Sequence, residues 1–220
     1  MAGPDAHLVF DLDGTLTDPR LGITRCYAYA LEQLGLPAPR LPELERHIGP
    51  PLRAVFAELL ATAEVERIER GVTLYRERFA TIGLFENAPY PEIHATLAEL
   101  RERGHALWVC TSKPLVYAER ILEHFALAEY FRGVYGDELR GAFADKARLL
   151  AHLLEREAIP AARAIMIGDR MHDARAARSN GARSIGVLYG FGDEPELTAA
   201  GVDALCAQVR DLPSVIAQLR

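Results

Sequence analysis

The sequence predicts an α/β fold, in which helices cover both faces of a parallel sheet and a helical module is inserted after the first strand. Short apolar runs alternate with longer stretches of helical periodicity along most of the 220 residues, and this alternation is typical of parallel sheets. From about residue 17 to residue 83 the alternation stops, and the pattern is helical throughout. Half of the residues are hydrophobic and a quarter are charged, which is ordinary for a globular protein.

Apolar runs of strand length mark the expected sheet. They are His7–Phe10, Ala106–Cys110, Gly133–Tyr135, Ala164–Ile167 and Ser184–Leu188. The helices expected between them are Tyr90–Arg103, Leu115–His124, Asp145–Glu157 and Asp173–Asn180. Gly181 follows Asn180, so this pair would cap the last helix at its C-terminus.

The interrupting stretch is expected to form helices only. They are Gly22–Leu34, Leu41–His47, Leu52–Leu60 and Glu64–Ile82, the last broken near Gly71. Apolar residues recur there at helical spacing, as in Val55, Phe56 and Leu59. With hinges at Thr15–Pro19 and Gly83–Ala88, the chain would divide into a core of residues 1–16 and 85–220 and an inserted domain of residues 17–84.

Two aspartates follow the first expected strand directly. Asp11 and Asp13 stand two residues apart after Phe10, and Gly14 ends the run. Side chains two apart on a strand point the same way, and open α/β sheets bind ligands at the carboxyl ends of their strands. Since adjacent carboxylates repel each other, the pair needs a cation, a shared proton or both. This is typical of a metal-assisted nucleophile with an acid/base group beside it.

Hydroxyl groups and a lysine come next along the chain. Thr111 and Ser112 end the second expected strand, and Pro114 suits the first turn of a helix. Their hydroxyls and nearby backbone N–H groups would then form an anion site at a helix N-terminus, unless they only cap that helix. Lys146 stands at the start of a later helix, where a lysine is usually a solvated surface residue.

A second aspartate pair repeats the opening pattern. One expected strand ends in Gly168-Asp169, and Asp173 follows four residues later. Asp169 would lead into a helix and Asp173 would lie on its first turn. The alternative is a helix-capping aspartate and a first-turn acid that complements the helix dipole. Because we expect this strand to lie beside the first one, we favour a functional pair.

These segments follow one another in a recognisable order. Oxygen ligands from Asp11, Asp13 and Asp169 suit Mg²⁺, and Lys146 and Thr111 would balance an anionic substrate. The segments DLDGT, CTS, the lysine and GDRMHD resemble, in order and spacing, the four motifs of the haloacid dehalogenase-like (HAD) superfamily. The resemblance covers essentially the whole chain.

The resemblance implies a Rossmann-like parallel sheet core with a cap domain, because the inserted α-helical module is similar to the C1-type cap of that superfamily. The segments Leu84–Tyr90, Thr111–Pro114 and Leu188–Gly192 look most like the phosphoglycolate phosphatase and 5′-nucleotidase-like branch. The implied activity is Mg²⁺-dependent hydrolysis of small-molecule phosphomonoesters, phosphoglycolate phosphatase-like, through an aspartyl-phosphate intermediate.

The same resemblance assigns roles to the site residues. Asp11 would be the nucleophile, and Asp13 would protonate the leaving alcohol and later deprotonate the attacking water. The implied metal ligands are the carboxylates of Asp11 and Asp169 and the backbone carbonyl of Asp13. Phosphate-binding residues would be Thr111, Ser112 and Lys146, with Asp173 orienting Lys146 or a metal-bound water.

The inserted domain is expected to exclude water from the site while it is closed. Its loop with Gly49, Pro50 and Arg53 looks like the substrate-specificity loop of C1 caps. Arg53 would meet a carboxylate or a second anionic group of the substrate, or else cover apolar surface as long basic side chains often do. A substrate contact of His172 is an equally open question.

Several other functions remain open at this point. They are a 5′-nucleotidase of the same family, a sugar-phosphate mutase similar to β-phosphoglucomutase, and a non-catalytic regulatory protein on this fold. The second aspartate, Asp13, argues for phosphoryl transfer over carbon–halogen cleavage, because the dehalogenases that the chain resembles lack it. The intact set of carboxylates and lysine argues against a non-catalytic role.

Net charge, cysteine content and hydropathy limit the classes of partner and the compartment that we expect. The net charge is −6 and there is no Lys/Arg-rich run, so nothing favours nucleic acid. Cys26, Cys110 and Cys206 stand far apart, which fits a reducing compartment without disulfides. We see no signal peptide and no run of the roughly 20 apolar residues that span a membrane. The expectation is a cytoplasmic enzyme for a small-molecule phosphate, with no nucleic-acid or membrane partner, working as a monomer or weak homodimer.

Overall fold

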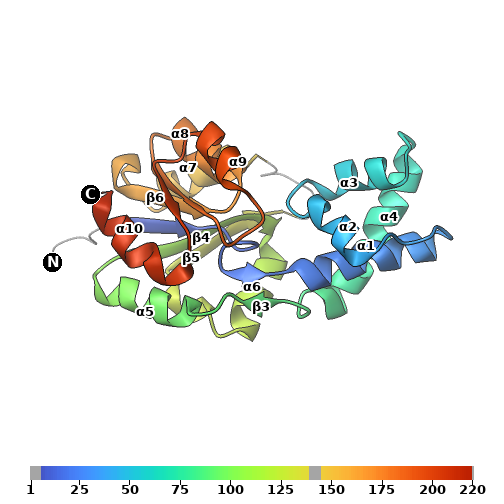
Figure 1. Cartoon of the computed structure of the whole chain (residues 1–220), viewed down its shortest axis with the longest axis horizontal. Helices are drawn as coiled ribbons and strands as arrows, with labels where there is room; N and C mark the ends of the chain where they lie inside the picture. Colours follow the sequence, from blue (N-terminus) through green and yellow to red (C-terminus); the bar gives the residue numbers. More distant parts are fainter. Residues whose placement is uncertain (1–5, 139–144, 220) are drawn as a thin grey trace. The chain divides into compact units, whose positions relative to one another are not determined.

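The computed structural model describes residues 6–138 and 145–219. The chain divides into two compact units (Figure 1). The α/β unit comprises Met1–Asp18 and Pro89–Arg220, and the helical unit comprises Pro19–Ala88. The structure thus places the crossings between units near Asp18 and Ala88, whereas the sequence predicted them after residues 16 and 84.

A six-stranded parallel sheet forms the centre of the α/β unit, with strand order β5-β4-β1-β6-β7-β8. The strands are β1 (His7–Phe10), β4 (Ala106–Pro114), β5 (Gly133–Asp137), β6 (Ala164–Gly168), β7 (Arg183–Val187) and β8 (Ala204–Cys206). Leu8, Val9 and Phe10 are fully buried, because β1 has neighbours on both sides and helices on both faces. The Rossmann-like α/β fold class is confirmed.

Six helices in the described part of the α/β unit surround the sheet. They are α5 (Ile93–Glu102), α6 (Leu115–His124), α7 (Lys146–Arg156), α8 (Met171–Ser179), α9 (Glu194–Ala200) and α10 (Leu212–Gln218), with short 3₁₀ turns η3 (Ala128–Tyr130), η4 (Ala161–Arg163) and η5 (Val209–Asp211). The buried leucines of α7 and alanines of α8 pack with Val9, Trp108 and Met166 from three adjacent strands. Figure 1 shows α5 and α10 across the sheet from α7 and α8.

The helical unit has its own aromatic core. Its helices are α1 (Arg20–Gln33), α2 (Leu41–Leu44), α3 (Leu52–Leu59) and α4 (Val65–Arg78), with the 3₁₀ turn η1 (Glu45–His47) and the π-helical turn η2 (Phe79–Gly83). The ring of Tyr27 lies 4.9 Å from that of Tyr75 and 5.7 Å from that of Phe56, measured between centroids. These rings join α1, α3 and α4 into one packed body.

The predicted break near Gly71 is wrong. Helix α4 runs through Gly71 without interruption, because a glycine there makes room for an aromatic ring rather than ending the helix. A Cβ atom on Gly71 would lie only 2.6 Å from the ring of Phe56. The irregular turn comes later, at Phe79–Gly83.

Other elements differ from the sequence prediction mainly at their ends. Helix α6 has the predicted bounds, α5 begins at Ile93 instead of Tyr90, and β4 extends to Pro114 instead of Cys110. The sequence prediction missed β8, α9 and α10. It also missed the short paired strands β2 (Thr17–Asp18) and β3 (Ala88–Pro89).

The predicted cap of α8 at Asn180-Gly181 is confirmed. Gly181 has a φ of +70°, and the N–H of Ala182 donates to the carbonyl of Ala177 at 3.0 Å. This is the left-handed glycine closure that commonly ends helices. Within the described ranges, all three cysteines are buried and none of them forms a disulfide. Among the residues that the structure describes, no helix has the length and apolar character needed to cross a membrane.

Candidate active site

Three buried carboxylates meet at the carboxyl ends of β1 and β6. These strands are neighbours, with Phe10 opposite Ile167, and the N–H of Asp11 donates to the carbonyl of Ile167 at 2.9 Å. Oxygen atoms of Asp11, Asp169 and Asp173 all lie within 4.8 Å of one another. The expectation that the second aspartate pair lies beside the first strand is therefore confirmed.

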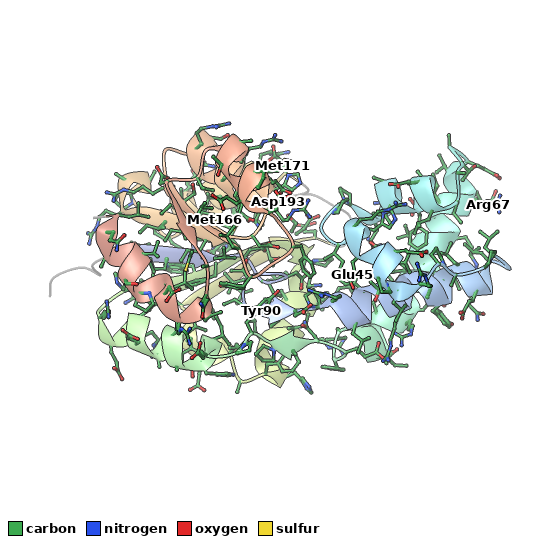
Figure 2. The ribbon with its side chains drawn as sticks, viewed as in Figure 1. Glu45, Arg67, Tyr90, Met166, Met171 and Asp193 are labelled. Atoms are coloured by element: carbon green, nitrogen blue, oxygen red, sulfur yellow. The ribbon has the colours of Figure 1, made fainter. Side chains whose placement is uncertain are left out.

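Asp169 lies on the short connection between β6 and α8, between Met166 and Met171, which Figure 2 labels. The N–H of Phe191 donates to its Oδ2 at 2.8 Å. Gly14 and Gly190 leave room for this carboxylate, since a Cβ on either would come within 2.4 Å of Asp169. Close backbone approach on two sides fixes where the Asp169 side chain points.

Asp173 has two tasks. Its Oδ2 accepts a hydrogen bond from the N–H of Arg170 at 3.1 Å, as a capping residue does. Its Oδ1 faces Lys146 Nζ at 2.5 Å. The capping alternative therefore holds for Asp173 together with an ion pair, whereas the residue at the N-cap of α8 is Arg170 and not Asp169.

Lys146 is not a surface lysine. Its side chain is only 6% exposed, and its Nζ lies 2.9 Å from Asp11 Oδ1 as well as 2.5 Å from Asp173 Oδ1. Helix α7 begins at this residue because Asp145 caps it, accepting from the N–H of Ala147 at 2.8 Å. The first turn of α7 thus carries a buried cation to the carboxylate cluster.

The structure corrects the prediction for Thr111 and Ser112. Strand β4 continues to Pro114, so these hydroxyls lie on the strand and not at the start of α6. Among the side chains of the described ranges, none caps α6. Thr111 is buried and its Oγ1 accepts from the N–H of Lys113 at 3.2 Å, whereas Ser112 is exposed.

Lys113 is a site residue that the sequence analysis missed. Its Nζ lies 2.7 Å from Asp13 Oδ2, with the side chains 7% and 21% exposed respectively. The position in the sequence could have indicated it, because residues two apart on a strand share a face and Lys113 stands two residues after Thr111 on β4.

Electrostatics of the cluster show a shortage of positive charge. Burial raises the pKa of Asp169 well above its ordinary value, and the Asp173 and Asp11 carboxylates raise it further. Burial also raises the pKa of Asp173 and of Asp13, although Lys146 opposes the first shift and Lys113 the second. Burial alone would lower the pKa of Lys146, but the attraction of Asp11 and Asp173 outweighs it and the pKa is raised.

The donor set fits a divalent cation. When all four carboxyl groups are ionised, they face two ammonium groups among the described residues, which leaves two negative charges uncompensated within the cluster. Among the described residues, Oδ1 of Asp169 is buried without a hydrogen-bond partner. Buried carboxylate oxygens of this kind are the hard ligands that Mg²⁺ takes, usually one or two per ion with water and phosphate completing the shell.

The predicted cap residues belong to the helical unit. Gly49 and Pro50 lie between η1 and α3, with Gly49 at a φ of +108°. Arg53 is 54% exposed and binds the carboxylate of Glu69 through Nε and through Nη2, the latter at 3.1 Å. In the α/β unit, His172 is exposed on α8.

Comparison with known proteins agrees with this geometry. A family model described as "Haloacid dehalogenase-like hydrolase" matches residues 8–187. The chain is 47% identical over 210 residues to a 5′-nucleotidase of Pseudomonas aeruginosa, covering 96% of this chain and 95% of that protein. It is 31% identical to a phosphoglycolate phosphatase of Caulobacter vibrioides, with 94% and 89% covered.

The chain is also similar to a protein named as a kinase and to a solved structure. The chain is 36% identical to the tyrosine-protein kinase PtkA of Mycobacterium tuberculosis, covering 84% of this chain and 62% of that protein. The crystal structure described as a predicted phosphatase from Clostridium acetobutylicum superposes with a TM-score of 0.91 at 38% identity, covering 99% of this chain and all of that one.

Proposed function

Because the chain belongs to the haloacid dehalogenase-like hydrolase family and is a phosphatase of that family, we propose that it hydrolyses small-molecule phosphomonoesters through an aspartyl-phosphate at Asp11, with Mg²⁺ as cofactor. The observation that carries this proposal is the buried cluster of Asp11, Asp169 and Asp173 with Lys146 between two of them. It offers a nucleophile and the charges that a phosphoryl group requires.

In the first proposed step, an oxygen of Asp11 attacks phosphorus and the bond from phosphorus to the leaving oxygen breaks. Asp13 gives its carboxyl proton to that oxygen, so the product leaves as a neutral alcohol. In the second step, water attacks the phosphorus of the aspartyl-phosphate and passes a proton to Asp13. Inorganic phosphate leaves, and the Asp11 carboxylate and the Asp13 acid are regenerated.

The surrounding residues position the phosphoryl group. Lys146 lies against Asp11, where it would also neutralise a phosphoryl oxygen, and Thr111 lies buried on the neighbouring strand. Asp11, Asp169 and the backbone carbonyl of Asp13 would hold Mg²⁺. When bound, this ion would neutralise charge on the phosphoryl oxygens.

For the substrate, a nucleoside 5′-monophosphate is our first candidate, because the relative that is 47% identical over nearly the whole chain is named a 5′-nucleotidase. We place 2-phosphoglycolate second, since a relative with that activity in its name is 31% identical. The sugar-phosphate mutase and non-catalytic alternatives have no comparable support.

The first experiment is phosphate release from a panel of phosphomonoesters, with Mg²⁺ and with a chelator. The panel contains nucleoside 5′-monophosphates, 2-phosphoglycolate, sugar phosphates and phosphotyrosine. We expect metal-dependent release with one preferred substrate, and we expect Asp11→Asn to lower it by more than about 10³-fold, as loss of a nucleophile does elsewhere. Circular dichroism of the variant controls for folding.

Two results would contradict the proposal. Near-normal turnover by folded Asp11→Asn would remove Asp11 from the nucleophile role. Isomerisation of a sugar phosphate without steady phosphate release would indicate a mutase instead.

The remaining proposals concern assembly and setting. We propose action in the cytoplasm as a monomer or weak homodimer, without nucleic acid or membrane, and three buried cysteines without disulfides support the reducing compartment. Light scattering at assay concentration and fractionation of cells check these points.

That the unit Pro19–Ala88 acts as a cap stays a prediction. Structures with and without a phosphate analogue check it, and an identical placement of this unit in both would contradict it.

A further inference from the structure

We propose that Lys113 is a positioning residue for Asp13. Its ammonium holds one carboxylate oxygen, Oδ2, and thereby leaves the other, Oδ1, to exchange the proton with the leaving group and with water. This inference rests on the proposed function, since it gives Lys113 a task within the same reaction.

The contacts of the Asp13 carboxylate are asymmetric. Lys113 Nζ lies 2.7 Å from Oδ2, and both side chains are largely buried. Oδ1 is buried too, but it has no hydrogen-bond partner among the residues of the described ranges. A buried carboxylate oxygen without a hydrogen-bond partner costs free energy. Because Oδ1 of Asp13 lies beside the proposed catalytic cluster, we infer that a reacting group occupies this position during turnover.

The backbone of Asp13 is held independently of Lys113. The carbonyl of Leu12 accepts from the N–H groups of Leu16 at 2.9 Å and Thr17 at 3.1 Å, and the N–H of Gly14 donates to the carbonyl of Thr17 at 2.8 Å. Gly14 allows this tight turn with a φ of +82°. The turn fixes the Cα–Cβ direction of Asp13, so the remaining freedom is rotation of its carboxylate.

Lys113 reaches Asp13 from the neighbouring strand. β1 and β4 pair in parallel with Phe10 opposite Val109, so the residues after each strand meet at the same sheet edge. The pairing of β4 with β5 shifts register between Thr111 and Pro114. This irregularity surrounds Lys113, and such local irregularities commonly redirect a side chain beside an active site.

The choice of lysine is itself informative. Of the 25 basic residues only Lys113 and Lys146 are lysines, and the other 23 are arginines. Both lysines lie buried at the carboxylate cluster. A guanidinium binds carboxylates through two parallel N–H groups, and at residue 113 it would engage both oxygens of Asp13. An ammonium is a compact point charge and can hold Oδ2 alone.

The two lysines have separate partners. Lys146 pairs with Asp11 and Asp173, and Lys113 pairs with Asp13. Loss of Lys146 would disturb the nucleophile and every substrate alike. Loss of Lys113 would disturb proton delivery to the leaving group, and its effect would then depend on how much the leaving group needs a proton.

The test compares two leaving groups by kcat/KM, which reports formation of the aspartyl-phosphate. Lys113→Met should lower kcat/KM about 10²-fold or more for the alkyl phosphate that the panel selects, in line with loss of general acid catalysis. For p-nitrophenyl phosphate, whose leaving group departs as a stable anion, the loss should stay below about tenfold. A burst of one nitrophenol per enzyme should precede slow turnover, because hydrolysis of the intermediate still needs Asp13.

The double variant Asp13→Asn/Lys113→Met provides the control, since Lys113→Met should change nothing further once Asp13 cannot carry the proton. Equal losses with both substrates, or a loss below threefold with the alkyl phosphate, would overturn the inference. An inactive wild-type enzyme, or an active Asp11→Asn, would instead overturn the proposed function.

A second readout needs no activity. With lysine labelled at the side chain, the chain gives two lysine signals in an NMR spectrum, one from each residue. Asp13→Asn should move the signal that Lys113→Met removes, and Asp173→Asn should move the other. If Asp13→Asn leaves the Lys113 signal in place, the pairing that we propose is absent in solution.

Discussion

At the scale of single residues, the site is organised by which cation faces which carboxylate. Lys146 is the only described group that bridges Asp11 and Asp173 by ion pairs. Since burial penalises each of these charges, the three depend on one another. Removal of Lys146 would leave two buried carboxylates facing each other.

Lys146→Met should therefore lower turnover about 10²-fold or more, the cost of losing one electrostatic contact in an active site. Steady-state phosphate release measures it. The matched control is Arg148→Met on the same helix, an exposed residue whose loss should leave turnover within about twofold. A loss below threefold for Lys146→Met would show that the site does not need this cation.

The residue scale also shows what sequence can and cannot predict. Asp11, Asp13, Asp169, Asp173 and Lys146 were predicted to meet, because strand ends and helix starts can be recognised from apolar runs and glycines. Lys113 was missed because its ion pair with Asp13 forms only if β4 lies next to β1, and the position of β4 in the sheet was not predicted. The assignment of Thr111 and Ser112 to a helix start was wrong, since β4 extends four residues further than its apolar run.

At the scale of elements, a partly buried glutamate joins two helices of the helical unit. Glu86 accepts from Arg25 of α1 at 2.7 Å and from Arg78 of α4 at 2.7 and 3.1 Å. Its backbone carbonyl accepts from the N–H of Gly22 at 2.8 Å. The hydrogen bonds of Arg78, together with Arg25, lower the pKa of Glu86 below its ordinary value despite partial burial.

A carboxyl group with a lowered folded-state pKa stabilises the protein above its unfolded pKa of about 4.5, and this stabilisation is lost as the pH falls through the lower folded value. Glu86→Gln should lower the melting temperature by roughly 2–4 °C at pH 7, and the difference from wild type should shrink towards pH 3. Glu77→Gln, at an exposed position of α4, is the control. A pH-independent difference would show that the charge of Glu86 is not responsible.

Element bounds followed from the sequence wherever the apolar pattern was long. The five strands and most helices were found within a few residues, whereas β8 with three residues and α9 with seven are too short for periodicity to stand out. A capping pattern did mark α9, because the Asp193 side chain accepts from the N–H of Glu196 and Gly201 ends the helix at a φ of +81°. Gly71 was misinterpreted because a glycine that accommodates a ring and a glycine that ends a helix look alike in sequence.

At the scale of the whole molecule, the proposed metal binds one of two units. Asp11, Asp169 and the other members of the cluster belong to the α/β unit. A ligand that binds only the folded state stabilises the segments that form its site. Metal binding should thus be seen locally, in the strand ends that carry the carboxylates.

We expect Mg²⁺ to slow amide hydrogen exchange about tenfold or more in peptides covering residues 8–18 and 164–175, and to leave peptides of α3 and α4 unchanged. Exchange followed by mass spectrometry, with Mg²⁺ and with a chelator, measures this. Asp169→Asn should abolish the protection. Protection spread evenly over the chain would contradict binding at this cluster.

The central place of β1 also has a consequence for how the chain is made. Residues 7–10 pair with 106–109 on one side and 164–167 on the other, so β1 gains its first neighbour only after about half of the 220 residues have been synthesised, and its second only after about three quarters. The helical unit, Pro19–Ala88, makes its own contacts over short sequence separations and is complete long before. Closing the sheet requires loops of about a hundred residues or more to form. Until then the apolar segment Leu8–Phe10 is exposed to the solvent, where nascent chains are open to aggregation.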